Sequence, residues 1–421
     1  MSGNKYLNAS FATFVAIFLI TSATKSVHII SILLMLLLLA YYIYFKRTKR
    51  GDIFLLNRDE RLLCLGLFCM FLSALPPLMV NDSLSVGLRE LDMPIRYVGF
   101  GILALLLFKL KPMIPRDRLF GLICIGGIIH GIIAILHIFV FPNMLFAGRY
   151  EGYVGIGPIG FVCGIFSILN LTLYLFYRPK YIFRCIFLIA SVFPIIGVIG
   201  SGLRGVALGV LFSLFVVLLI GGGYKVINYG KMLKIALVFL CLFGLVSYIV
   251  LANLPSKRLQ YSVVEFDAIS SGDYSTSVGQ RLVMYKEALA IFSLSPLFGM
   301  SAKTQLDNAE QISYLSGFSK AIDDAKEGKP LYGKKHNDVL TFMAKRGIVG
   351  LAALVLFYLA WINVFYRRDF ITFICGVSVL ALCIGAGFSS DPVSGFGEAT
   401  FMVLLLFCLI SAKDFKKEGY T

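Results

Sequence analysis

The chain has 421 residues, of which 58% are hydrophobic and only 15% are charged. Soluble domains contain about 25% charged residues, so this composition excludes an ordinary soluble protein and predicts an all-α membrane protein of many spans. The formal net charge of +16 could suggest a nucleic-acid partner. The lysines and arginines cluster in short loops between apolar runs, which is typical of membrane proteins and argues against nucleic acid.

About twelve apolar runs have the length expected of transmembrane helices. They cover residues 7–23, 27–45, 62–80, 95–109, 119–141, 157–177, 182–200, 204–221, 233–252, 338–364, 370–388 and 397–412. The first, fourth and last runs are short. The tenth is too long for one simple span, and Lys345 and Arg346 interrupt it. We therefore expect a short interfacial helix, two basic residues at the membrane surface, and a span that begins near Gly347.

The distribution of lysine and arginine predicts the orientation. The short loops on one side of the membrane, 81–94, 142–156 and 389–396, contain only Arg89 and Arg149 as basic residues. That side is expected to be the outer one, with both termini in the cytoplasm. The predicted organisation has three parts. Residues 1–251 hold nine helices, residues 252–337 form one large loop on the outer side with short amphipathic helices, and residues 338–421 hold three helices and a cytoplasmic tail.

The large loop contains one clear helical pattern. Apolar residues recur at helical spacing over residues 280–292, which predicts an amphipathic helix on the membrane surface that ends at Ser295 and Pro296. Residues 301–333 contain many turn residues and are expected to form a flexible flap.

Two arginines near the outer ends of apolar runs are candidates for binding an anionic substrate. Arg204 lies among glycines in SGLRG, which predicts a tight break between helices, and Arg281 lies near the start of the amphipathic helix. Guanidinium groups bind phosphate in a bidentate manner and stay charged at low dielectric, so this pair suits a diphosphate attached to a lipid. The structural alternatives are a snorkelling Arg204 and a salt bridge from Arg281 to Asp273 or Glu265.

A third arginine on this side, Arg96, follows Pro94 at the start of an apolar run. It is a further candidate for substrate binding. The structural alternative is a simple ion pair with Asp92 or Glu90.

His336 is the candidate for proton transfer. It lies where the polar loop meets an apolar run, after Lys334 and Lys335 and before Asn337 and Asp338. The lysines are expected to favour its neutral form, which accepts a proton, and the two following residues to orient its ring. The structural alternative is a polar residue that caps the next helix. No metal-binding or phosphate-cradling motif appears in an outer loop, so we expect neither metal nor cofactor.

At these residues the sequence resembles the O-antigen ligase and polymerase superfamily of bacterial envelope glycosyltransferases. Three segments carry the resemblance in order, SGLRGVAL (201–208), SVGQRLVMYKEALAIFSLSPLFG (277–299) and HNDVLTFMAKRGIVG (336–350), with weaker similarity at 91–98 and 148–161. The resemblance covers about residues 80 to 400. Asp338 stands where many members have glutamate, and Tyr285 where many have tryptophan, so a carboxylate and an aromatic ring are kept.

The resemblance implies a GT-C-type glycosyltransferase of the bacterial inner membrane that works without metal or nucleotide sugar. Its donor would be an O-antigen on undecaprenyl diphosphate, and its acceptor a sugar hydroxyl of lipid A-core oligosaccharide, on the periplasmic side. Arg204 and Arg281 would bind the diphosphate, and His336 would be the general base or help to hold the donor. The remaining candidates for substrate binding are Arg96, Lys334, Lys335, Tyr285, Asn337 and Asp338.

Two other functions remain open. A repeat-unit polymerase of the same superfamily would use the same donor, although the moderate length and compact loop favour a ligase. A membrane transporter or flippase would place charged residues at the membrane midplane, whereas the polar residues here gather at the outer ends of the runs.

Overall fold

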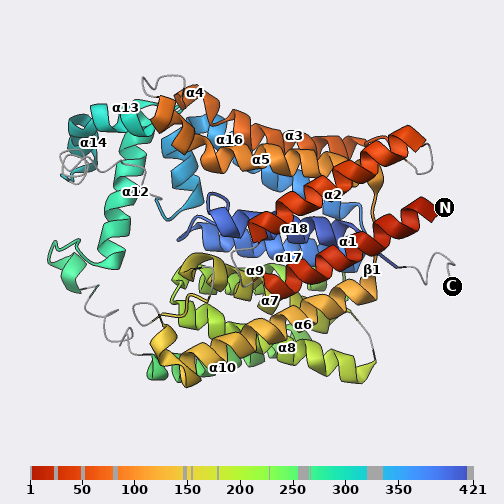
Figure 1. Cartoon of the computed structure of the whole chain (residues 1–421). Coiled ribbons are helices and arrows are strands. Elements are labelled where there is room, and N and C mark those ends of the chain that lie inside the picture. The colour runs from red at the N-terminus through yellow and green to blue at the C-terminus, as the bar shows by residue number, and fades with distance from the viewer. Residues whose placement is uncertain are drawn as a thin grey trace.

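The structure, a computed structural model, describes residues 2–22, 27–48, 53–78, 84–145, 149–152, 155–177, 180–226, 228–254, 265, 267–319 and 335–414. Its long helices run roughly side by side in one bundle (Figure 1). Three further helices, α12 (Ser277–Leu294), α13 (Ala302–Asp307) and α14 (Ala309–Ser316), lie at the left-hand end of the bundle in that view, where α12 crosses it.

The bundle is built from helices that coincide with the predicted apolar runs. They are α1 (Ser2–Thr21), α2 (Val27–Thr48), α3 (Arg58–Leu72), α5 (Leu84–Leu110), α6 (Arg116–Ile135), α7 (Ile156–Phe176), α8 (Tyr181–Ser201), α9 (Arg204–Gly223), α10 (Tyr229–Asn253), α16 (Asp338–Tyr366), α17 (Phe370–Gly387) and α18 (Phe396–Ile410). The smaller elements are α4 (Leu75–Leu78), a π-helical turn (Leu136–Val140), a 3-10 turn (Pro142–Met144), and the paired parallel strands β1 (Ile114–Pro115) and β2 (Ala412–Lys413).

Ten of the helices within the described residues are long and apolar enough to cross a membrane. Two shorter apolar helices, at Lys5–Thr21 and Phe396–Ile410, accompany them. The chain is thus a multi-pass membrane protein, as predicted, while twelve spans, the three-part division and the GT-C architecture stay predictions. The fourth run is not short: α5 begins at Leu84 and continues through Pro94.

The centre of the bundle is formed by α7 and α17. All but one of the α7 residues from Ile159 to Phe176 are buried, and so is most of α17. A helix that is apolar all round is stable only where other helices or lipid surround it. Because lipid is as apolar as these side chains, close packing and interhelical hydrogen bonds hold such a bundle together.

Helix α16 has a sharp kink at Gly347, where φ is 62° and ψ is −152°. The kink leaves backbone groups without partners inside the helix, and the turn between α12 and α13 binds them. Met300 N–H donates to the Ala344 carbonyl at 2.9 Å, and Ile348 N–H donates to the Pro296 carbonyl at 2.8 Å. The predicted change of helix near Gly347 is confirmed, and the turn after α12 is what supports it.

The outer layer differs in part from the prediction. The helix expected over residues 280–292 is α12, and it ends where Ser295 and Pro296 follow. The expected flap is wrong for its first half, because α13 and α14 form there. The Ser301 side chain accepts from Thr304 N–H at the start of α13, and Ile312 packs in a small core with Ile291. Residues 320–333 lie outside the described residues, and the position of α12 on a membrane surface stays a prediction.

Arg346, which was expected to mark the membrane surface, makes contacts within the protein. Its guanidinium donates to the Met70 carbonyl at 2.9 Å and to the Ser73 hydroxyl at 3.3 Å, and it stacks on the Phe342 ring. A cation at the C-terminal end of α3 binds carbonyl groups that the helix leaves without partners. Arg346 therefore attaches α3 to the kink of α16.

Candidate active site

His336 lies in the turn immediately before α16, with its side chain 46% exposed. Its φ is 52°, in the left-handed region that residues with a Cβ rarely adopt. Such a conformation costs roughly 1–2 kcal/mol and persists only where the surroundings enforce it, as they often do at functional sites.

A buried carboxylate that the sequence analysis missed, Asp391, lies next to the imidazole. Its Oδ2 is 3.8 Å from Nδ1 of His336, and its side chain is only 1% exposed. Its Oδ1 accepts from the Asn337 N–H at 3.0 Å and from the Thr341 hydroxyl at 2.8 Å. Asp391 is thereby held in place beside the ring. The signal in the sequence that could have indicated it is a lone aspartate in a short outer loop between two apolar runs.

Asp338, the carboxylate expected to orient the ring, has a different role. It is buried and accepts from the backbone N–H groups of Val393 and Ser394 at 3.2 and 3.3 Å. It thus holds segment 388–395, which carries Asp391. The Asn337 side chain caps α16 and donates to the Phe388 carbonyl at 3.1 Å, so it supports the same segment. Asn337 and Asp338 thus stabilise the segment that carries Asp391.

Tyr285 on α12 is the contact between the outer layer and the histidine. Its hydroxyl lies within donating distance of two carbonyl oxygens, that of His336 at 3.3 Å and that of Phe388 at 3.2 Å. Burial raises the pKa of Tyr285, so the phenol keeps its proton and can donate. Arg281 precedes Tyr285 by one helical turn and therefore lies on the same face of α12.

Arg204 begins α9, directly after the break that its glycines predicted. Gly202 ends α8 with φ 67°, which confirms the tight break. The guanidinium forms an ion pair with Glu265 at 3.0 Å. Glu265 had been the alternative partner of Arg281, but Arg281 makes no hydrogen bond or ion pair to any residue that the structure describes.

A third arginine, Arg149, joins these two. The neighbouring Tyr150 N–H donates to the Gly200 carbonyl at 2.9 Å, which fixes this loop beside the end of α8. Burial lowers the pKa of Arg149, and the positive charges of Arg281 and Arg204 lower it further. Arg149 is therefore close enough to both Arg204 and Arg281 for their charges to repel its own. In the sequence, Arg149 stood out only as one of the few basic residues in the outer loops.

The start of α9 also packs against the segment that carries Asp391. A Cβ at Gly205 would lie 2.6 Å from the Ser389 hydroxyl oxygen and 3.2 Å from the Ala386 carbonyl oxygen, so the absence of a side chain there favours this close approach. The arginine side of the site and the histidine side thus share segment 388–395 as a common wall. Arg204 and His336, far apart in the sequence, belong to one region at the same end of the bundle.

Two predicted residues, Arg96 and Lys335, have side chains that contact other groups of the protein. Arg96 pairs with Asp92 at 3.7 Å and stacks on Phe396, beside a separate cavity of about 290 Å³. Lys335 is 2% exposed, and its ammonium lies 3.6 Å from the buried carboxylate of Glu287. Substrate binding by either residue stays a prediction. Lys334 lies outside the described residues.

The arrangement can bind an anion and move a proton. Three guanidinium groups would neutralise a diphosphate, and an exposed imidazole beside a buried carboxylate could accept a proton from a hydroxyl group. Within the described ranges, no group of three or more histidine, cysteine, aspartate or glutamate side chains could hold a metal ion. Metal-independent chemistry stays a prediction.

Comparison with known proteins finds a matching family and one relative. The family model described as O-antigen ligase matches residues 189–355, which include Arg204, Arg281, Tyr285 and His336. An uncharacterized protein of Haemophilus influenzae is 26% identical over 379 residues, which cover 87% of this chain and 88% of that protein. The resemblance to the O-antigen ligase superfamily is confirmed, and the chain carries at residues 189–355 the domain of these membrane glycosyltransferase-like enzymes.

Proposed function

We propose that the chain is an O-antigen ligase. It transfers a glycan from undecaprenyl diphosphate to a sugar hydroxyl of lipid A-core oligosaccharide, at the periplasmic face of the inner membrane. The observation that supports this function best is the convergence of Arg149, Arg204 and Arg281 at the end of the bundle where His336 is exposed. Positive charge in a partly buried site needs an anionic partner, and a lipid diphosphate supplies one.

The proposed reaction is a single displacement. The acceptor hydroxyl oxygen attacks the anomeric carbon, and the bond from that carbon to the diphosphate oxygen breaks with its electron pair on the diphosphate. His336 takes the hydroxyl proton on Nε2, because Nδ1 faces Asp391. The carboxylate of Asp391 stabilises the imidazolium that forms. The arginines stabilise the charge on the departing diphosphate, and the configuration at the anomeric carbon inverts.

In the proposed orientation both termini are cytoplasmic and the site faces the periplasm. Short loops at the site end carry few basic residues, as the positive-inside rule requires of an outer side. Both substrates carry lipid anchors, so a site at the end of a membrane bundle meets them at the surface of the bilayer.

Purified protein with a defined lipid-linked donor and core acceptor tests the chemistry. We expect His336→Ala and Asp391→Asn to lower kcat by about 100-fold or more, because they remove the base or the charge that stabilises it. Arg281→Ala is expected to raise the KM of the donor. Lys286→Ala removes an exposed cation from the same helix and serves as the control, with unchanged kinetics. Full activity of His336→Ala would refute the assignment.

The choice between ligase and polymerase is tested in cells. Deletion of the gene for a ligase leaves lipopolysaccharide without any attached polymer. Deletion of the gene for a polymerase leaves core with a single repeat unit. The second pattern would show that the acceptor is a carrier-linked repeat rather than the core sugar.

A further inference from the structure

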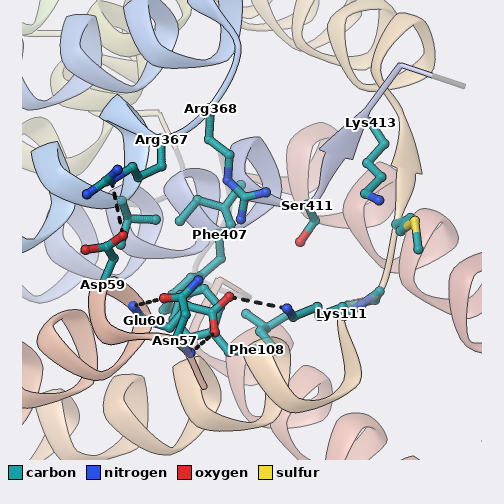
Figure 2. Close-up of a pocket in the computed structure, with 15 residues that line it drawn as sticks. Asn57, Asp59, Glu60, Phe108, Lys111, Arg367, Arg368, Phe407, Ser411 and Lys413 are labelled. Carbon is teal, nitrogen blue, oxygen red and sulfur yellow. Dashed lines mark hydrogen bonds and ion pairs between the residues drawn. The ribbon is translucent and has the colours of Figure 1, made fainter. Parts of the chain in front are cut away.

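A polar pocket lies at the opposite end of the bundle from His336. Its walls are the N-terminal end of α3 and the C-terminal ends of α5, α16 and α18, and its volume is about 270 Å³ (Figure 2). Helix α16 has 29 residues, so its ends are about 40 Å apart even before the kink is considered. The pocket is thus separate from the candidate active site.

The pocket carries an excess of positive charge. Its charged side chains are Asp59, Glu60, Lys111, Arg367, Arg368 and Lys413. Two of the basic groups form ion pairs, Lys111 with Glu60 at 3.6 Å and Arg367 with Asp59 at 3.4 Å. With four basic and two acidic side chains, the lining has a formal net charge of +2.

Arg368 is the basic residue of this pocket that is best placed to bind a ligand. Its guanidinium makes no hydrogen bond or ion pair within the described part of the chain, and Figure 2 shows it pointing into the pocket. Burial lowers the pKa of Arg368, although the charges of Glu60 and Asp369 oppose that shift. A partly buried cation without a hydrogen-bonded partner is costly, and a bound anion would offset the cost.

Two further donors line the same pocket. The hydroxyl of Ser411 makes no hydrogen bond to a described residue, and it lies near Arg368 in the close-up. Lys413 follows it at the rim. Guanidinium, hydroxyl and ammonium groups together are the donors that phosphate oxygens accept in proteins.

The rim of the pocket indicates that the anion comes from the membrane. Leu55, two residues before Asn57 of the lining, is 89% exposed. The neighbouring Phe54 N–H donates to the Lys109 carbonyl at 2.8 Å, so this apolar segment is held against α5. An exposed leucine is stable here if it enters the lipid interface. Basic pockets between transmembrane helices are common sites for lipid head groups.

We propose that this pocket binds the phosphate head group of an anionic phospholipid. Arg368 and Ser411 donate to the phosphate oxygens, and Lys413 adds positive charge at the rim. The bound lipid holds the ends of α3, α5, α16 and α18 together. This site is independent of glycan transfer.

Binding is tested with full-length protein in nanodiscs that contain either phosphatidylglycerol or phosphatidylcholine. We expect phosphatidylglycerol to raise the Tm of the wild-type protein relative to phosphatidylcholine. The difference between the two lipids should fall by more than half in Arg368→Ala. Lys234→Ala removes an exposed cation from α10 and should keep the full difference. Because each variant is compared with itself in two lipids, a general loss of stability does not affect the result.

Native mass spectrometry of detergent-solubilised protein gives a second measurement. We expect the affinity for phosphatidylglycerol to fall about tenfold in Arg368→Ala, since one charge-assisted interaction is lost. Equal lipid retention by wild type and Arg368→Ala would overturn the proposal. So would an equal loss in Lys234→Ala, which would indicate general charge attraction. If inorganic phosphate alone gives the full rise in Tm in detergent, the ligand is a free anion and the lipid proposal is wrong.

Discussion

The Tyr285 hydroxyl lies 3.3 Å from the carbonyl oxygen of His336 and is placed to donate to it. This contact joins α12, which carries Arg281, to the strained turn that presents the histidine. The position of α12, which is proposed to bind the diphosphate, therefore depends on the position of His336, and the position of His336 depends on α12. Movement of α12 would move both.

Replacement of Tyr285 tests this coupling. Tyr285→Phe removes the donor but keeps the ring, and the loss of one hydrogen bond is expected to cost about 1 kcal/mol. We expect kcat to fall by about fivefold if that energy is lost from the positioning of His336. Tyr274→Phe, in the same outer layer, removes a hydroxyl that makes no hydrogen bond to a described residue, and it should leave kcat unchanged. Equal kinetics of both variants would contradict the coupling.

Because His336 has a strained left-handed conformation, we expect a glycine at this position to stabilise the protein while it abolishes activity. His336→Gly and His336→Ala both lack the imidazole and should both be inactive. The glycine variant should be more stable by about 1 kcal/mol, since only glycine adopts φ 52° without strain. Thermal unfolding in one detergent measures the difference. A glycine variant less stable than the alanine variant would show that the turn is not strained.

Gly347 and Gly299 are expected to be essential for the kink of α16. Both have positive φ, and a Cβ on either would collide with the backbone of the other segment, at Leu297 or at Arg346. Alanine at either position should cost at least about 2 kcal/mol of stability. Gly244→Ala in α10, where a Cβ has open space, is the control and should be neutral or stabilising. Tm values of purified variants would show the contrast.

The buried pair of Lys335 and Glu287 distinguishes a structural lysine from a substrate-binding one. Lys335→Met leaves a buried carboxylate without its cation and should cost about 3–5 kcal/mol. The double variant Lys335→Met with Glu287→Gln should recover much of that stability and bind the donor with an unchanged KM. A stable double variant whose KM for the donor rises about tenfold would instead assign Lys335 to the substrate.

The charge of Arg149 should lower the stability of the protein without ligand and raise the stability of its complex with the donor. Its pKa is lowered on folding, so its charged form is disfavoured in the folded state and reduces stability throughout the neutral range. That penalty is relieved only as pH approaches the pKa of the arginine, and no change is expected between about pH 6 and pH 8. Arg149→Met should therefore raise the Tm without ligand and reduce the stabilisation by added pyrophosphate. Arg58→Met, at an exposed position at the other end of the bundle, should change neither value.

Local features of the sequence determined most of the helices and some of the site. Long apolar runs became the bundle because a backbone in lipid must satisfy its own hydrogen bonds, and this requirement acts on each segment separately. The break at Gly202 and the kink at Gly347 were equally visible, since a glycine among apolar residues acts through its own φ and ψ. His336, Arg204 and Arg281 could be selected because charge at the end of a span is costly.

Only the tertiary structure decided which of these residues act together. Asp391 became the neighbour of His336, and Arg149 the neighbour of Arg204 and Arg281, through contacts between segments far apart in the chain. Lys335 likewise pairs with Glu287 through a contact between segments far apart in the chain. Pairing of charges depends on distance and burial, which arise from how helices pack, whereas the pattern of apolar residues specifies only which face each helix buries.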